Sequence, residues 1–364
     1  MNRPLLLNPG PVTLSERVRN SLLLPDLCHR ESEFFDLQDE IRQRLLEVYG
    51  LDPAIWSAVL LTGSGTAAVE AMLSSLVPAP ADGGRLLVLE NGVYGERMTQ
   101  IAQRHGIACE AIRQEWTAPM DLAAVRRRLQ AQPAITHVAA VHHETTTGRL
   151  NTLDALAALC SEHGVTLLAD TVSSFGAESI DFSQPGLAAV AATANKCLHG
   201  VPGACFVMVR RTVLQQAKAR TLYLDLASWS RAQDQRGTPF TPSVHAYYGM
   251  REALREFADQ GGRAARHAGY AALAGQVADG LAALGVKPLL STAESSVVLR
   301  AYHLPEGISY ARLHDGLKAR DFVIYAGQGA LASSLFRIST MGALDTADMA
   351  RLLGEIRQLL AASA

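Results

Sequence analysis

The sequence has few cysteines, little net charge and no long apolar run, and each shortage excludes a class of protein. Five cysteines, an odd number without a Cys-x-x-Cys pair, indicate neither a disulfide framework nor a zinc site. Lys and Arg number 33 against 35 Asp and Glu, so no overall positive field attracts nucleic acid or an anionic membrane. No stretch approaches the roughly 18 apolar residues of a membrane helix, and the apolar run near the N-terminus is too short for a signal peptide. We therefore expect a cytoplasmic protein that binds small molecules, with no nucleic acid or membrane as partner.

The chain does contain enough apolar material for a large core. Of its 364 residues 48% are hydrophobic and 19% are charged, and this length favours two unequal lobes. Through the first two thirds, short β-branched runs alternate with amphipathic stretches, the pattern of a parallel sheet with connecting helices. The expected strands are 58–61, 85–89, 108–112, 137–141, 166–169, 188–191 and 205–209.

From about residue 261 the pattern changes. A long helix rich in Ala, Leu and Arg leads into the segment 295–301, a helix near 310–319, strands at 322–325 and 335–339, and a final helix from Thr346. We predict an α/β protein in which residues 16–260 form a large, mainly parallel-sheet domain and residues 261–364 a smaller α+β domain. Residues 1–15 are expected to pack near the small domain.

A glycine-rich turn follows the first expected strand. Residues 63–70 read Gly-Ser-Gly-Thr-Ala-Ala-Val-Glu and open a helix, where backbone N–H groups and the helix dipole stabilise a phosphate. The same residues fit a dinucleotide-binding fingerprint, with Glu90 where a ribose-binding acid belongs. They also fit a tight turn that binds no ligand. The motif alone therefore does not distinguish a phosphate site, a dinucleotide site and a turn without a ligand.

Asp170 and Lys196 narrow the choice. Asp170 ends a hydrophobic strand, where a buried carboxylate needs a cation or a hydrogen-bond donor. It could pair with a protonated pyridine nitrogen, cap the following turn, or pair with an arginine. Lys196 stands on a glycine-bounded loop, and a lysine with a lowered pKa forms Schiff bases. A phosphate-binding turn, an acid and a lysine are together what pyridoxal 5′-phosphate (PLP) requires, whereas a nicotinamide dehydrogenase explains only the first.

Two further motifs lie at or within strands. His142 and His143 are adjacent, so they point to opposite faces of a strand and are poorly placed to share an ion; we expect no metal site. Arg337 stands between apolar strand residues. Its guanidinium suits either a bidentate grip on a substrate carboxylate or a structural ion pair.

Together these motifs resemble the class V aminotransferases of PLP fold type I, most closely the 2-aminoethylphosphonate:pyruvate branch. The resemblance covers nearly the whole chain and implies a homodimer with shared active sites. The matching segments are 7–11, 63–65 with 69–71, 91–95 with 97–98, 143–148, 173–176, 194–197 with 200–203, 322–325 and 336–338.

The resemblance also implies a role for each matching residue. Lys196 forms the Schiff base and moves the proton between the substrate carbon and the cofactor's C4′, while Asp170 pairs with the pyridinium nitrogen. Arg337 binds the substrate carboxylate, helped by the backbone of Pro9 and Gly10. The remaining cofactor contacts are Ser64, Gly65, Thr66 and Asn195 at the phosphate, Tyr94 stacked on the ring, Thr145 near the ring, Val172 on the other face, and Thr241 at the phosphate of the neighbouring subunit.

One loop departs from the phosphonate branch. That branch has a tryptophan and acids after the cysteine, whereas this chain has His29 and Arg30 after Cys28. The His-Arg pair also resembles alanine:glyoxylate and serine:glyoxylate aminotransferases, and it either contacts a phosphonate dianion or is a structural pair of the loop. We predict transamination of 2-aminoethylphosphonate with pyruvate to phosphonoacetaldehyde and L-alanine. The alternatives are an alanine- or serine:glyoxylate aminotransferase and, in a different class, a PLP-binding protein without turnover.

Overall fold

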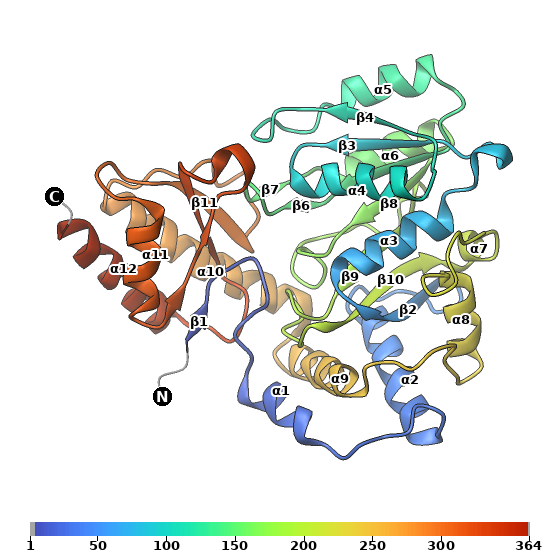
Figure 1. Ribbon diagram of the computed structural model, residues 1–364, viewed down its shortest axis with the longest axis horizontal. Helices are drawn as coiled ribbons and strands as arrows, with labels where there is room; N and C mark the ends of the chain where they lie inside the picture. Colours follow the sequence, from blue (N-terminus) through green and yellow to red (C-terminus); the bar gives the residue numbers. More distant parts are fainter. Residues whose placement is uncertain (1–3, 363–364) are drawn as a thin grey trace.

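The computed structural model describes residues 4–362, and a seven-stranded sheet dominates it (Figure 1). Every strand predicted for the large domain is present, with ends within two residues of those expected. One strand, β10, runs antiparallel to both of its neighbours, and the other pairs are parallel. The spatial order is β2 (Trp56–Gly63), β10 (Gly203–Arg210), β9 (Leu187–Thr193), β8 (Thr166–Asp170), β5 (His137–Val141), β3 (Leu86–Glu90) and β4 (Cys109–Arg113).

Helices cover both faces of this sheet. Successive residues of a strand point to opposite faces, so Leu60 joins one buried cluster and Leu61 the other. Strands buried on both faces are continuously apolar, which is why the sequence marks them clearly. One face carries α2 (Ser32–Glu47), α5 (Leu122–Ala131), α6 (Leu153–Glu162) and α9 (Val244–Asp259), and the other α3 (Gly65–Leu76), α4 (Val93–Arg104) and α8 (Leu226–Asp234).

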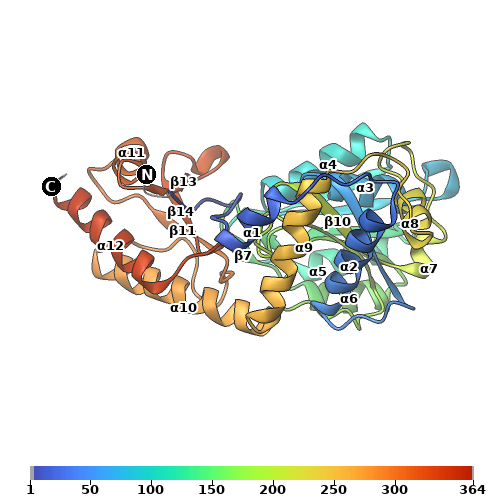
Figure 2. The ribbon, with the colours of Figure 1, turned by 90° about the horizontal axis from the view of Figure 1, so that it is seen from below.

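The C-terminal third builds a smaller layer beside the large sheet. The long helix α10 leads away from α9 and packs against α12, as Figure 2 shows. The helices of this layer are α10 (Gly262–Ala283), α11 (Tyr310–Lys318) and α12 (Thr346–Ala361). Its antiparallel sheet has the order β11 (Leu299–His303), β14 (Leu335–Ser339), β13 (Tyr325–Ala326).

The prediction of a single strand at 322–325 is wrong, because this segment forms two short strands that pair with different partners. Phe322–Val323 forms β12 and pairs in parallel with β1 (Leu5–Leu6), whereas β13 pairs with β14. Ile324 between them is fully buried. The N-terminal segment thus adds a strand beside the C-terminal elements; the domain boundaries drawn from the sequence stay a prediction.

Three short elements complete the helices and strands that concern the site. They are α1 (Glu16–Asn20), α7 (Arg211–Leu214) and the hairpin of β6 (His143–Glu144) with β7 (Arg149–Leu150). The hairpin extends from the carboxyl end of β5 toward β11 (Figure 1). Ligands of open α/β sheets bind outside the carboxyl ends of the strands, so this edge is where a site is expected. Within residues 4–362, no helix combines the length and apolarity needed to cross a membrane.

Candidate active site

Lys196 follows β9, and the N-terminal segment packs tightly against its side chain. Its Nζ donates a hydrogen bond to the carbonyl oxygen of Pro9. A Cβ atom on Gly10 would lie 2.8 Å from Cδ and 2.9 Å from Cε of Lys196, and Gly10 has a φ of +114°. Only glycine combines that backbone with so close an approach. The two backbone residues expected beside the substrate are therefore in contact with the lysine.

Burial shifts the pKa values of Lys196 and Asp170 toward each other. Burial lowers the pKa of Lys196 to about 8, and the neighbouring Asp170 carboxylate opposes this in part. Burial likewise raises the pKa of Asp170 to about 6, against a hydrogen bond of 2.9 Å from the backbone N–H of Val172 to Oδ1. That is the only hydrogen bond to this carboxylate from the described residues, so Asp170 retains capacity for a further donor.

The turn before α3 lies close to the loop that follows Asp170. Ser64 is the exposed N-cap residue, and its side chain makes no capping hydrogen bond. A Cβ atom on Gly65 would lie 2.7 and 2.8 Å from the two methyl carbons of Val172, so this glycine lets the turn approach the loop after Asp170. Arg97 donates to Thr66 Oγ1 at 3.3 Å and adds positive charge. A helix start with these features suits a phosphate.

Tyr94 lies in the first turn of α4, where its backbone is bound by the buried Glu144. No role for Glu144 was predicted from the sequence. The backbone N–H of Tyr94 donates to Glu144 Oε2 at 3.2 Å, and Thr146 Oγ1 donates to Glu144 Oε1 at 2.5 Å. Burial raises the pKa of Glu144 to about 7. Arg97 stacks over the Tyr94 ring, 4.7 Å from its centroid. Glu144 stands inside the quoted His-Glu-Thr-Thr-Thr-Gly motif, but its contact with α4 required the fold.

Arg337 on β14 is buried, and burial lowers its pKa. Neutral acceptors hold it: Nε donates to Ala326 O at 2.7 Å, and Nη1 donates to Thr145 O at 2.8 Å and to Gln328 Oε1 at 3.1 Å. No carboxylate of residues 4–362 lies within ion-pair distance, so the structural ion pair considered from the sequence is absent there. The Thr145 hydroxyl is buried, and no described residue is its hydrogen-bond partner.

The other residues predicted from the sequence make no direct side-chain contact with Lys196, Asp170 or Arg337 among the contacts described. Asn195, next to Lys196, accepts a hydrogen bond of 2.7 Å from Thr193. Thr241 is exposed, and its hydroxyl lies 3.4 Å from His29 Nε2. Arg30 is exposed and makes no ion pair with a residue in the described range. Within one chain, no hydrogen bond links the Thr241–His29 pair to Lys196 or Asp170.

Comparison with known proteins identifies the family. The sequence matches the family model described as Aminotransferase class-V over residues 20–340. The chain belongs to the class V aminotransferases. It is 38% identical over 361 residues to the 2-aminoethylphosphonate–pyruvate transaminase of Klebsiella pneumoniae subsp. pneumoniae, covering 97% of this chain and 96% of that protein.

Solved structures agree with this assignment. The aspartate aminotransferase of subgroup IV from Thermus thermophilus matches with a TM-score of 0.90 at 29% identity, covering 99% of this chain and 100% of that one. The alanine–glyoxylate aminotransferase from Nostoc sp. matches with a TM-score of 0.91 at 26% identity, covering 99% and 96%. The predicted fold, a PLP-dependent transferase of fold type I, is confirmed.

PLP is the cofactor of this aminotransferase, and the described residues fit it. Asp170 presents a buried carboxylate that can accept a further hydrogen bond, Gly65 lets the turn before α3 approach Val172, and the buried Thr145 hydroxyl lacks a partner among the described residues. The dinucleotide alternative is excluded by the family and by Glu90, which already binds Thr99 at 2.5 Å and Arg113 at 3.0 Å.

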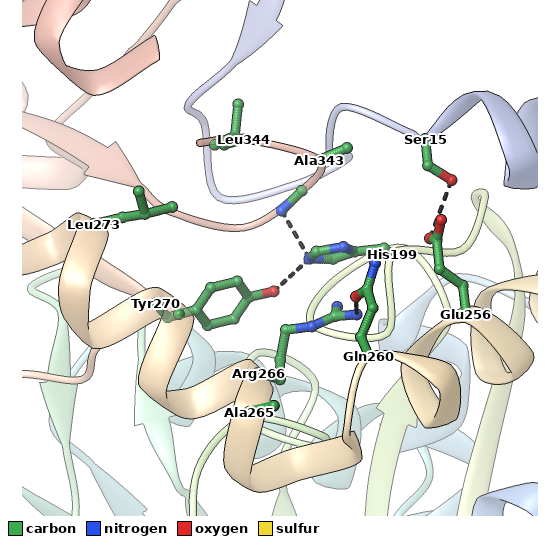
Figure 3. Close-up of a pocket in the computed structure, with 12 residues that line it drawn as sticks. Ser15, His199, Glu256, Gln260, Ala265, Arg266, Tyr270, Leu273, Ala343 and Leu344 are labelled. Atoms are coloured by element: carbon green, nitrogen blue, oxygen red, sulfur yellow. Dashed lines mark hydrogen bonds between the residues drawn. The ribbon is translucent and has the colours of Figure 1, made fainter. Parts of the chain in front are cut away.

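A polar network anchors the loop that follows the lysine of this aminotransferase (Figure 3). His199 Nε2 accepts hydrogen bonds from the Tyr270 hydroxyl at 2.5 Å and from the Gly342 N–H at 2.8 Å. Arg266, from the same helix as Tyr270, donates to the carbonyl oxygen of Cys197 at 2.6 Å. These bonds join the lysine loop to α10 and to the segment after β14. The sequence offered no indication of them, because the partners lie about 70 or more residues apart.

Proposed function

We propose that this aminotransferase transfers the amino group of 2-aminoethylphosphonate to pyruvate, forming phosphonoacetaldehyde and L-alanine. The observation that carries the proposal is the match over nearly the whole chain to a relative with that name. The site is consistent with it: both substrates carry an anionic group, and Arg337 is a buried cation without a carboxylate partner among residues 4–362. We also propose the cytoplasm as its location, which cell fractionation tests.

In this proposal each part of the chemistry belongs to a named residue. PLP, when bound, supplies an electron sink for the electron pair of the broken C–H bond. Lys196 holds the cofactor covalently and carries the proton between the substrate carbon and C4′. Burial lowers the pKa of the free Lys196 amine from 10.5 to about 8, which brings its deprotonated form closer to neutral pH, as a proton carrier requires. Asp170 keeps the ring nitrogen protonated.

The other residues bind and orient. We propose that Arg337 holds the substrate anion beside the backbone of Pro9 and Gly10, and that His29 and Arg30 border the donor. The proposed remaining cofactor contacts are Ser64, Gly65, Thr66, Tyr94, Thr145, Val172 and Asn195, with Thr241 contributed by the neighbouring subunit.

We propose that the enzyme is a homodimer that pairs through the surface around Thr241. Leu222 is 82% exposed and Leu23 84% exposed. Tyr223, also exposed, packs on the ring of Phe240 at 5.1 Å, directly before Thr241. Large exposed apolar side chains are typical of protein interfaces. Light scattering after size exclusion is expected to give the mass of two chains, and Leu222→Asp is expected to lower it; a single-chain mass for the wild type contradicts the proposal.

A donor panel on the purified holoenzyme tests the reaction. 2-Aminoethylphosphonate with pyruvate is expected to yield L-alanine, and Lys196→Ala is expected to lose both this activity and the visible Schiff-base absorption. Faster reaction of alanine or serine with glyoxylate would favour the glyoxylate branch, which the structural match to the Nostoc enzyme supports. Unchanged absorption with every donor would instead indicate a PLP-binding protein without turnover.

A further inference from the structure

The guanidinium of Arg337 offers a substrate only one of its nitrogens. Its Nε and both hydrogens of Nη1 are occupied by Ala326 O, Thr145 O and Gln328 Oε1. Nη2 donates to no residue in the range 4–362. A bidentate fork needs N–H groups on two nitrogens of the guanidinium. Arg337 alone therefore cannot hold both oxygens of a carboxylate in that way, and a second donor is required.

Gln328 is oriented to be that donor. A guanidinium only donates, so the atom of Gln328 that faces Arg337 is Oε1. Thr146 Oγ1 lies 3.5 Å from the same oxygen, but its single proton goes to Glu144 at 2.5 Å. Arg337 therefore sets the orientation of the amide. Its Nε2 group is directed away from the guanidinium contact, and no residue of the described chain accepts from it.

The loop that carries Gln328 is held against the large domain. Gly329, the next residue, has a φ of +53°, and a Cβ atom there would lie 2.7 Å from the Trp116 ring. Trp116 Nε1 in turn donates to Glu96 on α4 at 3.3 Å. The amide of Gln328 thus lies beside the end of the Arg337 side chain. Thr145, whose backbone oxygen accepts from Arg337 and whose buried hydroxyl has no partner among residues 4–362, belongs to the same cluster.

We propose that Gln328 is a substrate-binding residue of the anion site: a substrate carboxylate or phosphonate is held jointly by Nη2 of Arg337 and Nε2 of Gln328. This inference rests on the proposed function, since it names the second group that receives the substrate anion. Gln328 acts on binding and leaves the proton transfer at Lys196 untouched, so its loss raises KM while kcat changes little.

Calorimetry with non-reacting anions tests the inference on the holoenzyme. Gln328→Ala is expected to weaken the binding of propionate and of ethylphosphonate about tenfold, the effect of losing one hydrogen bond to a charged group. Gln328→Glu is expected to weaken both more strongly, about a hundredfold, because a carboxylate there pairs with Arg337 and repels the anion. The control is Ser333→Ala, an exposed serine of the same loop whose side chain makes no hydrogen bond with a described residue; it is expected to bind both anions as the wild type does.

Steady-state kinetics supply the second readout. The KM for pyruvate is expected to rise about tenfold in Gln328→Ala, with kcat within about threefold of the wild type. Binding of both anions within twofold of the wild type in Gln328→Ala overturns the inference, as does the absence of anion binding by the wild type. Gln328-dependent anion binding in an enzyme that does not convert 2-aminoethylphosphonate would support the inference and refute only the proposed reaction.

Discussion

Replacing Asp170 with asparagine is expected to stabilise the PLP-free protein at neutral pH. Burial raises the pKa of Asp170 from 3.8 to about 6, so the folded chain binds this proton more tightly than the unfolded chain. The contribution of such a group to stability is fully present below the unfolded pKa and is lost as pH rises toward the folded pKa. The charged form then costs about 1.5 kcal/mol at pH 5 and about 3 kcal/mol at pH 7 and above. Asparagine avoids this cost.

Urea unfolding of both PLP-free proteins between pH 5 and pH 8, at one protomer concentration, measures the effect. The advantage of Asp170→Asn is expected to grow from pH 5 to pH 7 and then level off. Asp181 provides a control, because hydrogen bonds from Ser183 and Gln184 lower its pKa; Asp181→Asn is expected to bring no such gain. With PLP bound the order reverses, since asparagine cannot pair with a protonated ring nitrogen.

Two results would refute this reasoning. One is an Asp170→Asn protein that is no more stable than the wild type at pH 8 without PLP. The other is a gain in stability that does not change with pH, because only ionisation of the buried carboxyl group makes the effect pH-dependent.

Other substitutions test the glycine turn before α3 and the loop that follows Lys196. Gly65→Ala is expected to lower PLP affinity at least about tenfold, because the new methyl meets Val172 at 2.7 Å, while Gly269→Ala, with nothing within 4 Å, leaves PLP binding unchanged; fluorescence titration compares them. Tyr270→Phe is expected to cost about 1 kcal/mol in urea unfolding, since His199 keeps its other donor. His199→Ala is expected to cost more, because it leaves buried donors unpaired, and equal losses in the two variants would contradict the network.

The seven-stranded sheet was predictable because most of its strands are buried on both faces and largely apolar. A run such as 188–191, which reads Ala-Ala-Val-Ala, is continuous in hydrophobicity, so its identity as a strand does not depend on which strand lies beside it. The start of α12 was equally local, since Asp345 and Asp348 form a capping box directly before and within its first turn. The prediction of one strand at 322–325 was wrong because the two halves of this segment pair with different strands. A run of four residues does not indicate which strand it pairs with.

The same contrast between local and long-range information applies to the active site. Lys196 and Asp170 were recognisable because each stands in a local motif at the end of an apolar strand. Gln328 was not, because its role depends on Arg337 occupying the amide oxygen and on Trp116 packing against its loop. The sequence by itself determined most of the strands and the cofactor class, and it led to the prediction of Lys196 and Asp170 as reacting residues, since these follow from nearest neighbours along the chain. Only the tertiary structure decided the pKa values of the buried groups and which donors remain free for a substrate, because burial and hydrogen-bond partners come from segments far apart in the chain.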